Sequence, residues 1–168
     1  AIEIMRWESE GGDAEFYHDH EVNETVNISI NNPAGAKSVK LTIAYLDAGN
    51  NWWWAIDNLI LAGEPEPIFA ENFDSLELGP FESDSESGGD GTDWTATAPS
   101  GWVQAKGDDH GPTAGGDVAV EFDGWTFLDP VSWNATAGQA RAEFTKGTGV
   151  VAVGDSDEYD DKADAKFN

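Results

Sequence analysis

The sequence predicts an all-β sandwich, and three observations lead to that class. Short stretches alternate apolar and polar residues with a period of two, as half-buried strands do. Turns rich in glycine, proline, asparagine and aspartate separate these stretches at close spacing. No window has a convincing helical period. A chain of 168 residues is the size of one ordinary domain and can bury a real core.

The first part of the chain contains four expected strands. Each alternates in the same way, and the fourth opens with three consecutive tryptophans. On a strand, Trp52, Trp54 and Ile56 would share one face, and Trp53, Ala55 and Asp57 the other. The four strands span residues 2–7, 25–30, 39–45 and 52–61; an acidic loop (8–24), a stop at 31–33 and a turn at 47–50 separate them.

The second part begins after the clearest punctuation in the chain, Glu64-Pro65-Glu66-Pro67. Prolines two residues apart cannot donate to a sheet and favour an extended, semi-rigid backbone, so this stretch is expected to be a linker. The expected strands beyond it are 69–73, 118–122 and 124–128, with an aromatic stretch at 94–102 that turns at 99–101, a hairpin of 140–145 with 149–153, and an acidic run from 155 to 164.

The net charge of the chain limits the classes of partner that it can bind. The formal net charge is −25, with 33 acidic against 8 basic side chains. This excludes a nucleic-acid partner and an anionic membrane surface, both of which need clustered lysine and arginine. It favours calcium, whose ligands are carboxylate and carbonyl oxygens. The alternative is an acidic surface adapted to a high-salt source. No apolar run is long enough for membrane insertion, and the absence of cysteine excludes disulfides.

Two separated stretches resemble a known group of modules. Phe69-Ala70-Glu71-Asn72-Phe73-Asp74, followed by Pro99-Ser100-Gly101-Trp102, is similar to the opening of jelly-roll modules of the MAM and cleaved-adhesin (choice-of-anchor J) type, and Trp54-Ala55-Ile56-Asp57-Asn58-Leu59 is similar to their closing strand. Such modules occur in large secreted bacterial proteins. The resemblance therefore implies a jelly-roll β-sandwich and an extracellular or cell-surface location.

The two halves stand in reversed order. Residues 1–63 resemble the closing half, 64–68 are the linker, and 69–168 resemble the opening half. Three interpretations stay open: a circular permutant that closes on itself, one unit of a tandem array, or a chain that exchanges halves with neighbouring copies and forms a head-to-tail filament. In the last two, the sandwich is completed by strands from a neighbouring subunit or repeat.

The resemblance also implies a structural calcium ion that joins the first and last strands. Glu71 and Asp74 would supply oxygens from the opening strand, and Asp57 from the closing strand. A mid-strand acid such as Asp57 needs a partner, which a cation provides; the alternative is a surface position with a hydrogen bond to a turn. Oxygen density suggests a second calcium loop at Asp155, Asp157 and Asp160, equally well explained as a solvated turn.

Other constellations are weaker. His18-Asp19-His20 offers zinc only two imidazoles and no evident further ligand. The run Trp52, Trp53 and Trp54 is expected to contact a ligand or a subunit with the face that is not core. No catalytic motif is present. We therefore expect a non-catalytic, calcium-stabilised structural or adhesion module that binds copies of itself; the alternative is a carbohydrate-binding accessory module, for which glycans are the partners.

Overall fold

The computed structural model describes residues 2–8, 23–49, 53–63, 65–79, 94–105, 124–135, 139–155 and 164–167. These residues fall into two compact units, 1–41 and 42–168. Strands predominate and helix is scarce. Every strand pair is antiparallel, as expected for an all-β chain.

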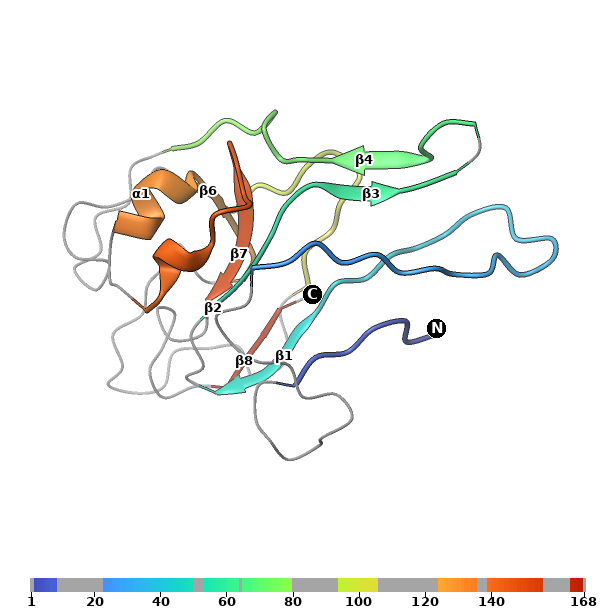
Figure 1. Ribbon diagram of the computed structural model, residues 1–168, viewed down its shortest axis with the longest axis horizontal. Coiled ribbons are helices and arrows are strands. Elements are labelled where there is room, and N and C mark those ends of the chain that lie inside the picture. Colours follow the sequence, from blue (N-terminus) through green and yellow to red (C-terminus); the bar gives the residue numbers. More distant parts are fainter. Residues whose placement is uncertain are drawn as a thin grey trace. The chain divides into compact units, whose positions relative to one another are not determined.

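The first unit contains no strand among its described residues, 2–8 and 23–41. Residues 23–41 form two extended segments around a turn (Figure 1), closed by a hydrogen bond from the Ala36 N–H to the Pro33 carbonyl (3.0 Å). Gly35 takes the positive φ (81°) that this turn requires. The predicted strands 2–7 and 25–30 are thus not strands here, because alternation alone does not supply a hydrogen-bonded partner.

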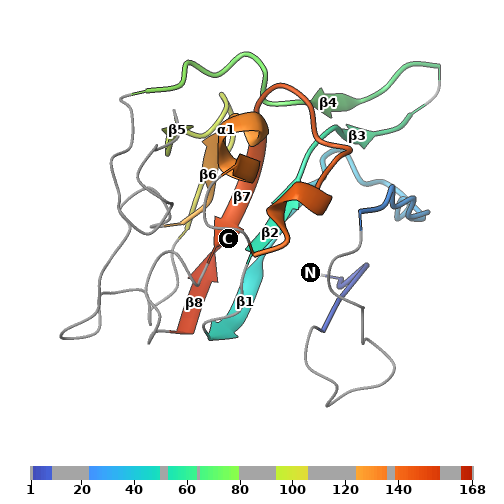
Figure 2. The same ribbon diagram turned by 60° about the vertical axis from the view of Figure 1, so that its left-hand side comes forward.

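The second unit is built around a four-stranded sheet in the order β2-β7-β6-β5, which Figure 2 shows side by side. Two further pairs accompany it, β1 with β8 and the hairpin β3–β4. The predicted turn at 47–50 is wrong, because β1 covers most of it. The strands are β1 (Tyr45–Gly49), β2 (Trp53–Ile56), β3 (Leu59–Leu61), β4 (Phe69–Glu71), β5 (Trp94–Thr95), β6 (Thr126–Leu128), β7 (Val151–Asp155) and β8 (Asp164–Phe167).

Strand β7 is the centre of the sheet, and all five of its residues are buried. It pairs with β2 on one side (Trp53 opposite Asp155) and with β6 on the other (Thr126 opposite Val153). The predicted hairpin of 140–145 with 149–153 is therefore wrong. Residues Arg141–Glu143 form a short 3₁₀ helix instead, and β7 takes its partners from distant parts of the chain.

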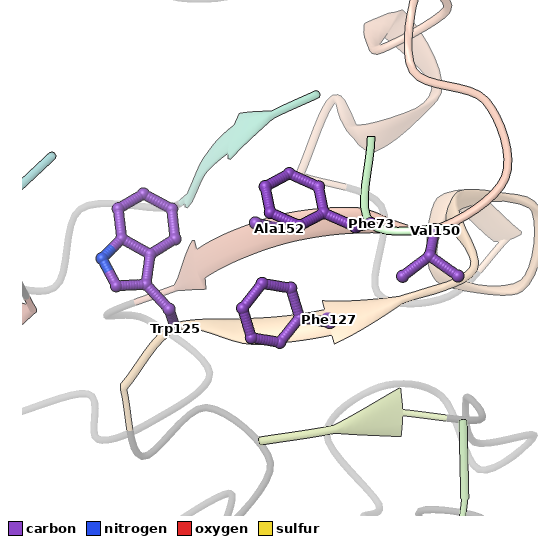
Figure 3. Packing of buried hydrophobic residues seen from close by; sticks show 5 residues of the cluster. All are labelled: Phe73, Trp125, Phe127, Val150 and Ala152. Atoms are coloured by element: carbon purple, nitrogen blue, oxygen red, sulfur yellow. The ribbon is translucent and has the colours of Figure 1, made fainter. Parts of the chain in front are cut away.

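Apolar side chains lie on both faces of this sheet. One cluster contains Phe73, Trp125, Phe127, Val150 and Ala152 (Figure 3), with Trp54 and Ile56 packed against it. The other contains Leu128, Trp133, Val151 and Val153, with Trp53 and Ala55 packed against it. The predicted division of the tryptophan strand between two faces is confirmed, and both faces belong to the core.

Helix α1 (Pro130–Ala135) supplies Trp133 to the second cluster, and Phe144, directly after the 3₁₀ helix, packs against it. The helix begins where Asp129 accepts a hydrogen bond from the Val131 N–H (2.9 Å) and Pro130 occupies the first helical position. These are ordinary helix-start signals. The helix itself has only six residues, which is too short for a helical period to stand out in the sequence.

Candidate functional site

The corner between β2 and β3 holds the first candidate ligand, Asp57. The chain leaves β2 here because Asn58 takes a left-handed conformation (φ 53°), which asparagine tolerates better than most residues. Both Asp57 oxygens accept hydrogen bonds from Asn58, one from its backbone N–H (2.7 Å) and one from its side-chain amide (2.8 Å). The predicted continuous strand 52–61 is therefore two strands, and Asp57 lies at their corner.

The turn after β4 holds the other two candidates, Glu71 and Asp74. Glu71 accepts a hydrogen bond from the Phe73 N–H (2.7 Å), which closes the turn. Phe73 has a positive φ (61°) and is fully buried, so its packing fixes the turn despite the backbone strain. Asp74 accepts a hydrogen bond from the Asn72 amide (2.7 Å).

One three-residue segment, Thr148 to Val150, connects the two acids. The Thr148 N–H donates to Asp57 (3.1 Å), and the Val150 N–H donates to Asp74 (2.9 Å). Gly149 lies between them with φ 70°, and a Cβ atom at this position would collide with the Asp74 carboxylate. The structure thus brings Asp57 and Asp74, far apart in the sequence, to the same segment at the start of β7. We call Asp57, Asp74 and residues 148–150 the acid clamp.

Within the acid clamp, the charged neighbour that acts on Asp57 is Asp74, which is also negative. Partial burial raises the pKa of Asp57 above its ordinary value of 3.8, and the negative charge of Asp74 raises this pKa further. The N–H groups of Thr148 and Asn58 act in the opposite direction and lower it. The ionised form of Asp57 is thus disfavoured overall, and a bound cation would reverse that balance.

Glu71, the last residue of β4, lies three residues before Asp74 of the acid clamp. It is half-buried and stands directly opposite Leu59 across β3 and β4. Together with Asn58 and Asn72 it lines a depression of about 360 Å³ on the hairpin, whose remaining lining is Leu59, Ile60 and Ala70. Oxygen-bearing side chains therefore converge on this end of the hairpin from both of its strands.

The chemistry of this donor set fits a hard cation. Carboxylate and amide oxygens are the groups that calcium uses, whereas zinc prefers imidazole and thiolate. Within the described residues there is no group of three or more His, Cys, Asp or Glu side chains that could hold a metal ion. Calcium also accepts amide and backbone oxygens, so Asn58 and Asn72 count as possible ligands beside the three acids. These amides were not singled out from the sequence; their positions next to Asp57 and Glu71 were the available signal.

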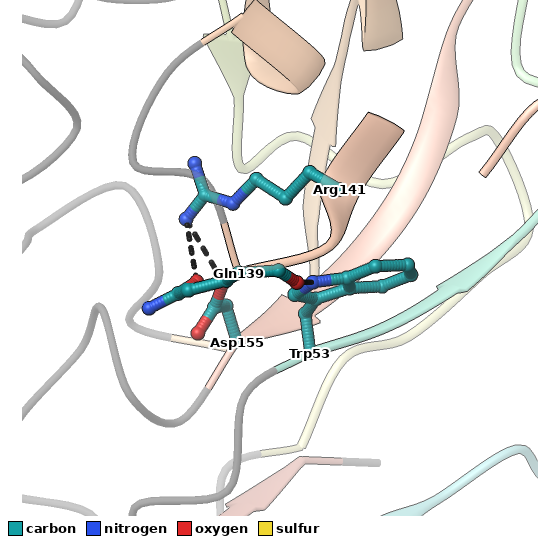
Figure 4. Close-up of polar contacts among 4 residues, drawn as sticks. All are labelled: Trp53, Gln139, Arg141 and Asp155. Carbon is teal, nitrogen blue, oxygen red and sulfur yellow. Dashed lines mark hydrogen bonds and ion pairs between the residues drawn. The ribbon is translucent and has the colours of Figure 1, made fainter. Parts of the chain in front are cut away.

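The second predicted calcium loop has a different environment. Asp155 is fully buried at the end of β7, and its carboxylate pairs with Arg141 (3.3 Å), also fully buried (Figure 4). Arg141 stacks its guanidinium over the Trp133 ring at 5.0 Å and donates to the Gln139 side chain (3.2 Å). Asp157 and Asp160 lie outside the described residues, as does His18-Asp19-His20, so their metal binding stays a prediction.

The tryptophan run is largely part of the core. Trp53 stacks edge-on against Trp133 (4.8 Å between ring centroids), and its indole N–H donates to the Gln139 carbonyl (2.9 Å; Figure 4). Trp54 packs against Trp125 (5.5 Å) on the opposite face. Both are half-buried. Trp52 lies outside the described residues. The contact role of all three stays a prediction; the packing of Trp53 and Trp54 within the core gives no support to the carbohydrate-binding alternative.

Comparisons with protein-family models, with curated proteins and with solved structures give no significant match. The resemblance to jelly-roll modules therefore rests on the quoted residues alone. Among the described residues, no helix has both the length and the apolar character needed to cross a membrane.

Proposed function

We propose that this chain is a non-catalytic, calcium-stabilised module of jelly-roll type that works in an extracellular structural or adhesive assembly. The observation that carries the proposal is the acid clamp. Asp57 and Asp74 come from different strand ends and meet at one backbone segment, and the negative charge of Asp74 adds to the cost of ionising the half-buried Asp57. A divalent cation would offset both the burial of the ionised Asp57 carboxylate and the like charge of Asp74 beside it.

Calcium would act here as a structural tie. Asp57 and Asp74, with oxygens from Glu71, Asn58 or Asn72, would hold the ion and thereby connect the β2–β3 corner, the turn after β4 and the segment before β7. Each of these carries strain or a tight turn, seen in the positive φ of Asn58, Phe73 and Gly149. A tie at this point would restrain all three together. Extracellular modules bind calcium at about 10⁻⁴–10⁻³ M, so calcium outside the cell would load such a site.

The remaining support comes from charge and fold class. The net charge of −25 suits a cation-rich exterior, and the antiparallel sheets agree with the sandwich class that the resemblance implies. The jelly-roll topology, the extracellular location and the absence of catalysis are parts of the proposal.

Thermal unfolding with calcium and with EDTA tests the proposal. An ion that binds only the folded chain stabilises it by about 2.7 kcal/mol at a concentration 100 times its dissociation constant, so the melting temperature should rise clearly with calcium. Magnesium should raise it less, because magnesium keeps its waters and demands a stricter octahedral geometry. Equal melting temperatures in calcium and EDTA would reject the proposal.

Two variants locate the ion. Asp57→Asn and Asp74→Asn keep the shape of each side chain and remove one charge, so each should lose most of the gain from calcium while changing the stability in EDTA far less. Glu77→Gln removes one exposed charge outside the acid clamp and is the matched control. Calorimetric titration should give one calcium ion per chain at this site. Unchanged calcium binding in both Asn variants would place any ion elsewhere.

A further inference from the structure

Residues 25–41, here called the arm, differ from the rest of the chain in charge and in apolar exposure. The arm contains Lys37 and Lys40 and no acidic residue, while all 33 acidic residues lie elsewhere. Its large apolar side chains are 38–59% exposed: Val26, Ile28, Ile30, Val39 and Leu41. These residues alternate with polar ones, which is the pattern of a strand with one buried face. A positively charged, strand-patterned segment thus presents its apolar face to solvent in a strongly acidic protein.

The hairpin β3–β4 presents a complementary surface in the second unit. Leu59 and Phe69 pack inward, Leu59 on the core cluster and Phe69 against Trp102 (5.9 Å). The opposite face carries Ile60, directly across from Ala70, and Ile68 two residues before it. Ile60 and Ile68 are 65% and 70% exposed. We call Ile60, Ile68 and Ala70 the hairpin stripe.

The hairpin stripe is bordered by acids and has room for another strand. Glu66 lies in the turn between β3 and β4, and Glu71 ends β4. The sheet has two strands, so one edge of each is without a strand neighbour among the described residues. Two-stranded sheets are marginal alone, and open edges are natural sites for a further strand. The two lysines of the arm complement the acids of this hairpin. Two arms would repel each other, because both are positively charged.

We propose that the arm of one copy of this chain pairs with the hairpin β3–β4 of a second copy. Val26, Ile28 and Ile30 would lie beside the hairpin stripe on the same face of the enlarged sheet, and Lys37 and Lys40 would lie near Glu66 and Glu71. Because the two surfaces differ, the contact is head-to-tail, and a pair of copies retains one free arm on one copy and one free hairpin on the other, so the assembly can grow further. This inference rests on the assembly part of the proposed function and identifies the two surfaces that make the contact. It does not require calcium at the acid clamp.

Sedimentation velocity of the whole chain, in calcium and separately in EDTA, tests the pairing. The wild-type chain should form species larger than a monomer as its concentration rises. Ile60→Asp in the hairpin stripe and Ile28→Asp in the arm should each weaken this association at least about tenfold, because a charge would enter an apolar contact. Val103→Asp is the matched control, because Val103 is 85% exposed and lies outside both surfaces. Its association should equal that of the wild type.

Mixing the two variants gives the sharpest result. The Ile60→Asp chain keeps an intact arm and the Ile28→Asp chain keeps an intact hairpin, so the mixture should form one-to-one dimers that grow no further. Circular dichroism of each variant, matching that of the wild type, shows that these exposed positions leave the fold intact. A monomeric wild-type chain, or a mixture that stays monomeric, would overturn the proposal. The calcium test reads melting temperature rather than mass, so the two proposals fail separately.

Discussion

At the end of β7, Asp155 is fully buried and its carboxylate faces Arg141; just before the start of the same strand, Asp57 and Asp74 share one backbone segment. The first acid has a complete counter-charge within the chain. The charged neighbour that influences the pKa of Asp57 is another acid. One end of the strand thus has an internal ion pair, and the chain before its other end donates the Thr148 and Val150 N–H groups to two acids. This difference is what supports the proposal that a cation binds at the Asp57 end of the strand.

Breaking the internal pair should have the largest effect. Arg141→Met leaves Asp155 as a buried charge without its guanidinium partner, and Asp155→Leu does the reverse, so each should lower the free energy of unfolding by about 3–5 kcal/mol. The double variant Arg141→Met/Asp155→Leu should recover more than half of that loss, because no buried charge remains. Urea unfolding measures all three. Single variants within about 1 kcal/mol of the wild type would show that this pair does not stabilise its end of β7.

A smaller loss is expected at the opposite end. Gly149→Ala places a Cβ atom against the Asp74 carboxylate and forces alanine into a positive φ, which should cost about 2–3 kcal/mol. Gly101→Ala is the matched control, because Gly101 also has a positive φ (89°) but open space around its Cβ position. That variant should lose about 1 kcal/mol, from strain alone. Equal losses would mean that contact with Asp74 contributes nothing.

The smallest effect concerns pH in the absence of metal. Because the pKa of Asp57 is raised in the folded state, its protonated form favours folding. This contribution is fully present below the ordinary value of 3.8 and is lost as the pH rises through the raised folded pKa. In EDTA, the stability of the wild type relative to Asp57→Asn should therefore fall as the pH rises through that window. The opposite slope would contradict the raised pKa.

Local patterns predicted the local features of this fold well. Alternation placed Trp53 and Trp54 on opposite faces, and the turn at Pro99 is present, with the Trp102 N–H bonded to the Pro99 carbonyl (3.0 Å). The expected strand at 124–128 corresponds to β6. These features depend on neighbours in sequence, so the periodicity and the turn residues carry the information.

The remaining features depend on partners far away in the chain. Nothing near Asp155 indicates that Arg141 will face it, and nothing near Asp57 indicates the N–H of Thr148 as its donor. The left-handed Asn58 divides the predicted strand, and an asparagine in a sequence permits that conformation without predicting it. Two of the three predicted calcium ligands, Asp57 and Asp74, do meet at residues 148–150. Apart from Gly149, nothing in the sequence of that segment indicated that it would contact them.

The register of the central sheet also has a consequence for synthesis. Trp53 in β2 is opposite Asp155 in β7, about a hundred residues later, so a ribosome at 5–20 residues per second leaves β2 without this neighbour for roughly 5–20 s. During that time Trp53 and Trp54 lack the side chains that finally pack against them. Pairing over such a separation also slows folding, and we expect refolding in milliseconds to seconds by stopped-flow tryptophan fluorescence. The dense negative charge would keep nascent chains apart while they wait.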